Sequence, residues 1–369
     1  MSTDIRPETG LRNASEKAGS IAAKYADAGD AQRDLTVEVV DALREAGFAR
    51  HFVSSRWDGG DGTFGEFVQG VFNVAEGCAS AAWCAALLAA SARFASYLPE
   101  AGHRELWGSS PDTLIADGLI PAGKAQPVAG GHRLSGTWPY ITNVSFADWA
   151  LLCASVGDGP QPELRFFALP RGSYRAIENW DNAGMRATGS HSLVVEDVFV
   201  PEHLSYNRQD MVEGRNRWSS DPNHNIPYQA TGALMLVTPG VGAALGAVKA
   251  AVQALKGKKL QEASQIELTR AVARIDAARL LVEQSAATVD RRSLTPALIA
   301  RNQRNGVFAN EEVAEGVNGL IRAAGTRGLS ESYRLERFWR DTISATSHVG
   351  LRYDNTRIAA TYSALLIDS

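Results

Sequence analysis

Residues 136–149, GTWPYITNVSFADW, decide the fold because they join two expected strands through a polar turn. Trp138 and Tyr140 alternate with smaller residues, as side chains on one face of a strand do. Three polar residues then crowd together: Thr142, Asn143 and Ser145. A planar ligand with a polar edge needs an apolar wall and a few directed hydrogen bonds, and this stretch supplies both. An ordinary hairpin with aromatic packing would show the same pattern.

The composition is that of an ordinary globular chain. It has 369 residues, of which 45% are hydrophobic and 21% charged, enough for a large core over two or three domains. The net charge of −4 gives no electrostatic case for binding nucleic acid, and no basic run indicates a membrane surface. We therefore expect neither nucleic acid nor a membrane as a partner.

The cysteines and the apolar segments indicate a reducing, cytoplasmic setting. Cys78, Cys84 and Cys153 lie in apolar runs, with neither zinc-ligand spacing nor a disulfide framework. The first ten residues have no apolar core of a signal peptide. Residues 78–92 are the most apolar window, but they are shorter than a membrane span, so a buried helix is expected.

Residues 1–112 are expected to form an N-terminal α-helical domain. Thr63, followed three residues later by Glu66, forms a capping box that opens one of its helices. The next helix, from about residue 80 to 97, is apolar on nearly every side and should be central. Two of its residues are candidates for contact with a substrate, with core packing as the alternative: Ser80 and Trp83.

Residues 113–205 change period and predict a central β domain. Short alternating or apolar segments are separated by glycine and proline turns. The expected strands are 113–118, 132–138, 149–154, 164–169 and 192–200. This pattern favours a small barrel or sandwich.

Residues 206–228 are polar and aperiodic, and a loop of this length inside a compact chain is usually functional or disordered. We interpret the segment as a substrate lid, with a solvated linker as the alternative. Its candidates for the substrate pocket are Trp218 and His224. Residues 229–369 return to long amphipathic helices with short loops, as in a four-helix bundle. The expected fold class is therefore α+β, in the order helical domain, β domain, lid and bundle.

The chain lacks the short motifs of several common enzyme classes. It has no glycine-rich loop of the Rossmann or P-loop type, no HExxH motif, no Cys/His cluster and no GxSxG elbow. The sequence therefore gives no support for a conventional hydrolase, a metalloenzyme or a nicotinamide-dependent enzyme, and no metal site is expected.

Four segments carry a family resemblance: 140–143 (YITN) with 147–149 behind it, 184–190 (GMRATGS), 195–201 (VEDVFVP), and Glu336-Arg337 with Arg340-Asp341. They resemble the acyl-CoA dehydrogenase superfamily over nearly the whole chain. The first is similar to the aromatic-Ile-Thr-Asn flavin motif of that family. The others resemble its second β-domain motif, the strand that closes this domain, and the arginine-aspartate run of its last helices.

Residues 347–350, SHVG, decide the branch. Many acyl-CoA dehydrogenases have a Tyr-Glu-Gly catalytic segment here, although some relatives place the glutamate elsewhere. Residues 340–353, RDTISATSHVGLRY, are instead similar to the two-component flavin monooxygenases, among them the tailoring oxygenases of aromatic polyketide antibiotics. The resemblance implies an oxygenase that takes reduced FMN or FAD from a separate reductase. O₂ would add to the flavin as a C4a-hydroperoxide, which hydroxylates an aromatic or polycyclic molecule such as a polyketide, phenol or indole.

The resemblance also implies roles for individual residues. Thr142 would bond flavin N5, because a hydroxyl can donate or accept, and Ser145 or Asn143 is the second choice for the same edge. Four further residues would contact the flavin: Trp138 and Tyr140 as the wall of the ring, and Thr188 and Ser190 at the pyrimidine edge or ribityl chain.

His348 is the expected acid–base residue, because imidazole titrates near neutral pH. Its structural alternative is a histidine satisfied in the core or exposed on a helix. Arg340 or Asp341 would orient it or bind flavin phosphate, and a plain interhelical ion pair is the alternative.

Residues 324–329, AGTRGL, resemble the inter-subunit cofactor loop of the family, which implies a homotetramer built as a dimer of dimers. Three other functions stay open. The chain would then be an N-oxygenase of an amine or amino sugar, an acyl-CoA dehydrogenase with tightly bound FAD, or a helical binding protein that has lost its flavin.

Overall fold

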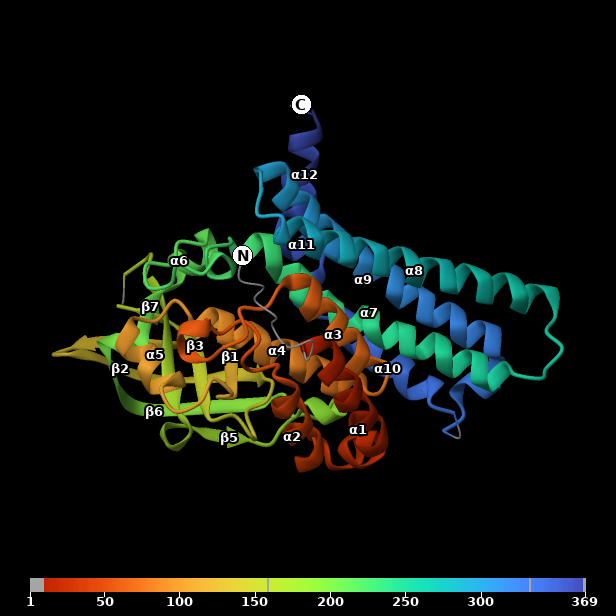
Figure 1. Cartoon of the computed structure of the whole chain (residues 1–369), viewed down its shortest axis with the longest axis horizontal. Helices are drawn as coiled ribbons and strands as arrows, with labels where there is room; N and C mark the ends of the chain where they lie inside the picture. Colours follow the sequence, from red (N-terminus) through yellow and green to blue (C-terminus); the bar gives the residue numbers. More distant parts are fainter. Residues whose placement is uncertain (1–9, 158, 332, 368–369) are drawn as a thin grey trace, which may run out of the picture.

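The computed structural model describes residues 10–157, 159–331 and 333–367. Helices form the first part of the chain, strands the middle and long helices the last part, which confirms the expected α+β fold (Figure 1). The helices of the first part are α1 (Leu11–Gln32), α2 (Val37–Ala46), α3 (Phe64–Ala75), α4 (Ala79–Ala95) and α5 (Glu100–Trp107).

The start of α3 shows how the helical parts are joined. The predicted capping box is present: Thr63 Oγ1 accepts a hydrogen bond from the Glu66 amide, and a Glu66 carboxylate oxygen accepts one from the Thr63 amide. The carboxylate of Asp290, at the end of α8, accepts hydrogen bonds from the amides of Phe64 and Gly65, each at 2.9 Å. A negative charge here compensates the helix dipole and fastens α3 to the C-terminal bundle.

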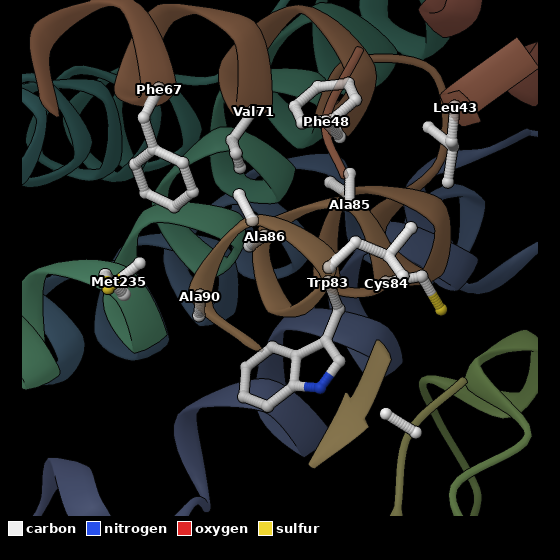
Figure 2. Close-up of a cluster of buried hydrophobic side chains, with 14 of the residues drawn as sticks. Leu43, Phe48, Phe67, Val71, Trp83, Cys84, Ala85, Ala86, Ala90 and Met235 are labelled. Carbon is white, nitrogen blue, oxygen red and sulfur yellow. The ribbon is translucent and has the colours of Figure 1, made fainter. Parts of the chain in front are cut away.

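Helix α4 lies at the centre of the molecule. It contacts α3 in the first part of the chain, β1 in the sheet, and α7 and α10 in the last part. Figure 2 shows Ala86 facing Phe67 and Val71, whereas Trp83 extends from the opposite side of the helix. The small alanines allow close packing on one face, so α4 can present Trp83 to the sheet and the terminal helices.

The central segment forms one sheet with the strand order β5-β6-β2-β1-β3-β4-β7. Its strands are β1 (Ile115–Val128), β2 (Gly131–Ile141), β3 (Trp149–Val156), β4 (Glu163–Pro170), β5 (Arg175–Ile177), β6 (His191–Pro201) and β7 (Ser205–Asn207). The β1–β3 pair is parallel, and the other pairs are antiparallel. This arrangement brings the end of β2 and the start of β6 together.

The expected alternation of Trp138 and Tyr140 on one strand face is wrong. Trp138 is completely buried, whereas Tyr140 is 70% exposed. The β2–β6 register shifts between Trp138 and Ile141, and Tyr140 has a φ of 61°. This left-handed backbone turns the chain between the two aromatic residues, so the two-residue period of a regular strand is lost.

The polar segment 206–228 has more structure than the sequence predicts. It contains the end of β7, the helix α6 (Arg208–Glu213) and a 3₁₀ turn at Pro222–His224. Asn223 and His224 are buried, and their side chains bond backbone carbonyls of the N-terminal region. These two polar side chains satisfy buried backbone groups, which a sequence pattern does not distinguish from solvation.

The last part of the chain is a bundle of long helices with a short C-terminal extension. Its helices are α7 (Tyr228–Leu255), α8 (Glu262–Asp290), α9 (Pro296–Ala324), α10 (Leu335–Thr346), α11 (Tyr353–Thr356) and α12 (Ile358–Ile367). α7 is long and apolar enough to cross a membrane, but 78% of its most apolar window is buried inside the protein, as in a core helix. α12 packs against α9, where Arg304 donates to the Tyr362 hydroxyl, and points away from the β sheet (Figure 1).

Candidate active site

A chain of three buried hydroxyl groups lies where β2 ends and β6 begins. Thr142 Oγ1 is 2.8 Å from Ser190 Oγ, which is 2.8 Å from Thr188 Oγ1. Thr188 Oγ1 in turn donates to the carbonyl oxygen of Met185 at 2.9 Å. The structure thus brings together three of the residues that the sequence predicted to contact a flavin.

The direction of these hydrogen bonds follows from proton counting, since each hydroxyl has one proton. Thr188 gives its proton to the Met185 carbonyl, so Ser190 must donate to Thr188. Ser190 then has no proton left for Thr142, so Thr142 must donate to Ser190. The oxygen of Thr142 also accepts from Trp83 Nε1 at 3.3 Å and retains one lone pair. Thr142 is therefore set as an acceptor towards any further group.

Trp83 connects this hydroxyl chain to the C-terminal part of the protein. Its indole nitrogen donates to Thr142, and its ring centroid lies 5.7 Å from that of His348, with an angle of 52° between the planes. This spacing is within the range of favourable aromatic contacts. Trp83 is buried and contacts both of these polar groups.

His348 follows α10 directly and is partly buried. Its Nδ1 accepts a hydrogen bond from the amide of Gly350 at 3.1 Å. Burial lowers the pKa of His348 below its ordinary value of 6.5, so the ring is neutral at pH 7. Because Nδ1 accepts, the single ring proton is on Nε2. His348 is therefore a hydrogen-bond donor at Nε2, and the base that the sequence suggested would require the other tautomer.

Asn143 adds an acceptor beside Thr142. Its amide nitrogen donates to the Cys84 carbonyl at 3.2 Å, and its φ of 69° turns the chain out of β2. Its Oδ1 is buried and has no hydrogen-bond partner among the described residues. A buried polar atom without a partner is costly, so Oδ1 is suited to accept from a bound group.

Arg340 and Asp341 fasten the loop before the hydroxyl chain to α10. The Asp341 carboxylate accepts from the Met185 amide at 2.7 Å, and Arg340 donates to the Ala183 carbonyl at 2.9 Å. Arg340 also pairs with Asp30 at 2.8 Å. Burial raises the pKa of Asp341 to about 6, against the opposing effect of Arg340. No described contact joins either residue to His348, so the geometry matches the ion-pair alternative.

Five other predicted residues lie away from this centre or take a packing role: Trp138, Ser145, Ser80, Trp218 and His224. The Trp138 indole donates to the Cys153 carbonyl at 2.7 Å inside the sheet, so it does not wall a ligand. Ser145 is exposed and bonds the Asp34 carboxylate, whose pKa burial raises. Ser80 is buried in α4.

His224 and Trp218 lie in a different part of the molecule, His224 buried and Trp218 at the surface. His224 bonds the Phe52 carbonyl at 2.6 Å and Ser219 at 2.7 Å, and burial lowers its pKa to about 4, as for a structural histidine. Trp218 is 49% exposed and lines an open cavity of about 670 Å³. The arginines of this cavity, among them Arg165, are already paired with carboxylates.

Ser91 and Asp117 form a further polar pair, which no sequence motif predicted. Ser91 Oγ, on α4, lies 2.6 Å from Asp117 Oδ1, on β1. Burial raises the pKa of Asp117 to about 6. The available signal was an acidic residue within the otherwise apolar run LIADGL at 114–119, where a carboxylate would need a reason to be buried.

Comparisons with known proteins show which group of proteins the whole chain is similar to. The family description "Acyl-CoA dehydrogenase, C-terminal domain" matches residues 234–353. The chain is 28% identical over 336 residues to the flavin-dependent monooxygenase oxygenase subunit HsaA of Rhodococcus jostii (strain RHA1), covering 86% of this chain and 88% of that protein. It is 30% identical over 301 residues to the indole-3-acetate monooxygenase of Pseudomonas putida, covering 80% of this chain and 74% of that protein.

A solved structure extends the likeness to the whole chain. XiaF from Streptomyces sp., in complex with FADH2 and glycerol, matches with a TM-score of 0.90 at 25% identity, covering 97% of this chain and 95% of that chain. Sequence and fold agree in pointing to the same group. The chain belongs to the acyl-CoA dehydrogenase superfamily, in its branch of oxygenase components of two-component flavin-dependent monooxygenases.

Proposed function

We propose that this protein uses reduced flavin and O₂ to hydroxylate an aromatic small molecule. The observation that carries the proposal is the position of Trp83, whose indole touches both Thr142 and His348. It joins a hydroxyl acceptor in the β domain to an imidazole donor in the C-terminal domain. Names of relatives support the substrate class, since they specify resorcinol, indole-3-acetate and p-hydroxyphenylacetate.

The hydrogen-bonding groups fit a reduced flavin. Reduced flavin has an N–H at N5, and Thr142 Oγ1 has a free lone pair because its own proton is directed to Ser190. Asn143 Oδ1 offers a second acceptor nearby in the sequence. The exposed ring of Tyr140 would provide the wall of the site. The solved complex of XiaF favours FADH2 over reduced FMN.

When bound, reduced flavin supplies the two electrons that activate O₂. The residues of this chain would then control the surroundings. Trp83 would exclude water from the space between the two domains, which limits the wasteful release of peroxide. The Nε2 proton of His348 would donate to an acceptor at the reacting ring of the substrate and orient that ring.

The experiment is an assay with a separate NADH-dependent flavin reductase, FAD, NADH and ¹⁸O₂. We expect one ¹⁸O atom in the product of a phenolic or indolic substrate, with product formed only when the reductase is present. If resorcinol, indole-3-acetate, p-hydroxyphenylacetate and 2-naphthol all remain unmodified while NADH is consumed, the proposed function is wrong.

The reductase and further copies of the chain are the proposed partners, in the cytoplasm. A homotetramer is supported by α12, an apolar helix with Leu366 62% and Ile367 82% exposed, which would be covered by another subunit. We expect light scattering to give a mass near four times 39.5 kDa. A monomer at micromolar concentration would contradict this assignment.

The alternatives from the sequence receive less support. Many acyl-CoA dehydrogenases carry their catalytic carboxylate at the position where this chain has His348. N-oxygenation of an amine would be favoured by an acidic residue at the reacting nitrogen. Asp117 is hydrogen-bonded to Ser91, which lies two helical turns from Trp83 on α4. Asp117 is therefore too far from the proposed reaction centre to act on the reacting nitrogen. The motion of 206–228 as a lid stays a prediction.

A further inference from the structure

One face of α4 runs from Trp83 to Ser91, away from the residues proposed to contact the flavin. Trp83, Leu87 and Ser91 are spaced by four residues, so their side chains follow one another along the same side of the helix. Every residue of α4 is buried except Leu87. Solvent therefore reaches the middle of the central helix on this face, between Trp83 and Ser91.

The far end of this face is polar. Ser91 Oγ is 2.6 Å from Asp117 Oδ1 and 2.7 Å from the Leu87 carbonyl oxygen. Because a serine has one proton, Ser91 can donate to only one of these acceptors at a time. The other oxygen of Asp117, Oδ2, has no partner among the described residues and is not among their fully buried polar atoms.

Asp117 is thus an under-satisfied carboxylate. An ionised carboxylate inside a protein is stabilised by two or three hydrogen bonds or by a cation. The described part of the chain provides at most the Ser91 proton, and no lysine or arginine side chain there pairs with Asp117. A carboxylate accepts but does not donate, so the missing partner is a hydrogen-bond donor.

The surroundings of this carboxylate are aromatic and include two phenols, Tyr206 and Tyr228, whose pKa values Asp117 helps to raise. The Phe94 ring, one turn beyond Ala90 on the same helix, lies 6.0 Å from that of Tyr228. Burial raises the pKa of Tyr228 to about 12, and Asp117 adds to this effect, so Tyr228 remains a neutral phenol near the carboxylate. Leu87 occupies the middle of the face, between the polar end and Trp83.

The two ends are about 12 Å apart, since Trp83 and Ser91 are separated by eight residues at about 1.5 Å each. This is longer than a single aromatic ring. We infer that Asp117, oriented by Ser91, binds a hydroxyl group at the far end of an elongated aromatic substrate of two or more rings, whose reacting ring lies against Trp83 and His348. The inference rests on the proposed function and specifies its substrate class.

The test measures binding to the flavin-free protein, so it does not depend on oxygenase activity. Kd is determined by calorimetry for 2-naphthol and for naphthalene, which has no donor. We expect Asp117→Asn to raise the Kd for 2-naphthol about tenfold, because one charge-assisted hydrogen bond is lost. The Kd for naphthalene should change by less than about twofold. Ser91→Ala should give a smaller loss of the same kind. The matched control is Asp210→Asn, at a half-buried carboxylate outside this face.

Four results would overturn the inference. The first is an unchanged 2-naphthol affinity in Asp117→Asn. The second is an equal loss for naphthalene, and the third is the absence of 2-naphthol binding to the unaltered protein. Tighter binding of 1-(aminomethyl)naphthalene than of 2-naphthol would also contradict it, because it would indicate an amine. If the Asp117-dependent binding is found but no substrate is hydroxylated, only the proposed function fails.

Discussion

The indole of Trp83 donates a hydrogen bond to Thr142 Oγ1 across 3.3 Å, between a helix of the first part of the chain and the end of β2. The bond uses one of the two lone pairs of this oxygen, and the proton of Thr142 is directed to Ser190. Thr142 is consequently an acceptor with one open position. This relationship underlies the preference for a ligand with an N–H at its edge.

Thr142→Val should selectively weaken the binding of reduced flavin. The substitution removes the hydrogen-bond acceptor without changing the size of the side chain. We expect the Kd for FADH2 to rise about tenfold, as for one lost hydrogen bond of about 1.4 kcal/mol. Anaerobic titration measures this Kd. The matched control is Thr238→Val, which removes a buried hydroxyl that donates to the Leu234 carbonyl within α7. Equal effects of the two substitutions would contradict the contact.

Thr188→Val should reduce the discrimination between reduced and oxidised flavin. Without the Thr188 hydroxyl, Ser190 is free to donate to Thr142, so the Thr142 proton can turn towards the ligand and meet the unprotonated N5 of oxidised flavin. We expect the ratio of Kd for FAD to Kd for FADH2 to fall several-fold. An unchanged ratio, with the hydroxyl chain otherwise intact in a crystal structure, would refute the one-way arrangement.

The protonation state of His348 should determine how the coupling between NADH oxidation and product formation depends on pH. Its pKa lies below 6.5, so the ring is neutral throughout the range above pH 7. Coupling should be constant from pH 7 to 8.5 and should change only below pH 6.5, as the ring gains a proton. In His348→Gln the coupling should be lower, and this change below pH 6.5 should be absent.

The lowered pKa of His348 also makes the stability of the protein depend on pH. The unfolded chain takes up the His348 proton at a higher pH than the folded chain, since folding lowers this pKa. The free energy of unfolding should therefore decrease as the pH falls below 6.5, and His348→Gln should remove that contribution. Urea denaturation at pH 5.5 and 7.5 measures it. A larger pH effect in the variant would show that the sign is wrong.

Asp117 should make the unliganded protein less stable at neutral pH. Folding raises its pKa from 3.8 to about 6, so the folded state binds this proton more tightly and stability decreases as the pH rises through that interval. Asp117→Asn removes the penalty of an ionised group and should raise the free energy of unfolding by about 1–3 kcal/mol at pH 8. No gain at pH 8, or an equal gain at pH 4, would contradict this account.

The sequence predicted the parts of the site that lie within short motifs. Thr142, Thr188 and Ser190 stand in two such motifs, and the pairing of β2 with β6 brings their hydroxyl groups together. Trp138 and Tyr140 were assigned to one face because a regular strand has a period of two, which the left-handed backbone at Tyr140 breaks. Propensity and spacing do not reveal such a local distortion.

Other features depend on contacts between distant segments. His224 looked like a pocket residue because it is a polar side chain in a polar stretch, but it bonds the Phe52 carbonyl, 172 residues away in the chain. Ser91 and Asp117 are 26 residues apart, on a helix and a strand with no common period. Only the packing of α4 against β1 makes them a pair.

The most direct test of the central claim is a crystal structure of the protein with FADH2, grown without oxygen. The account predicts that flavin N5 lies about 2.7–3.2 Å from Thr142 Oγ1. Trp83 and His348 should both lie on the same side of the flavin ring. A flavin bound elsewhere, or an N5 hydrogen bond made by a group other than Thr142, would contradict it.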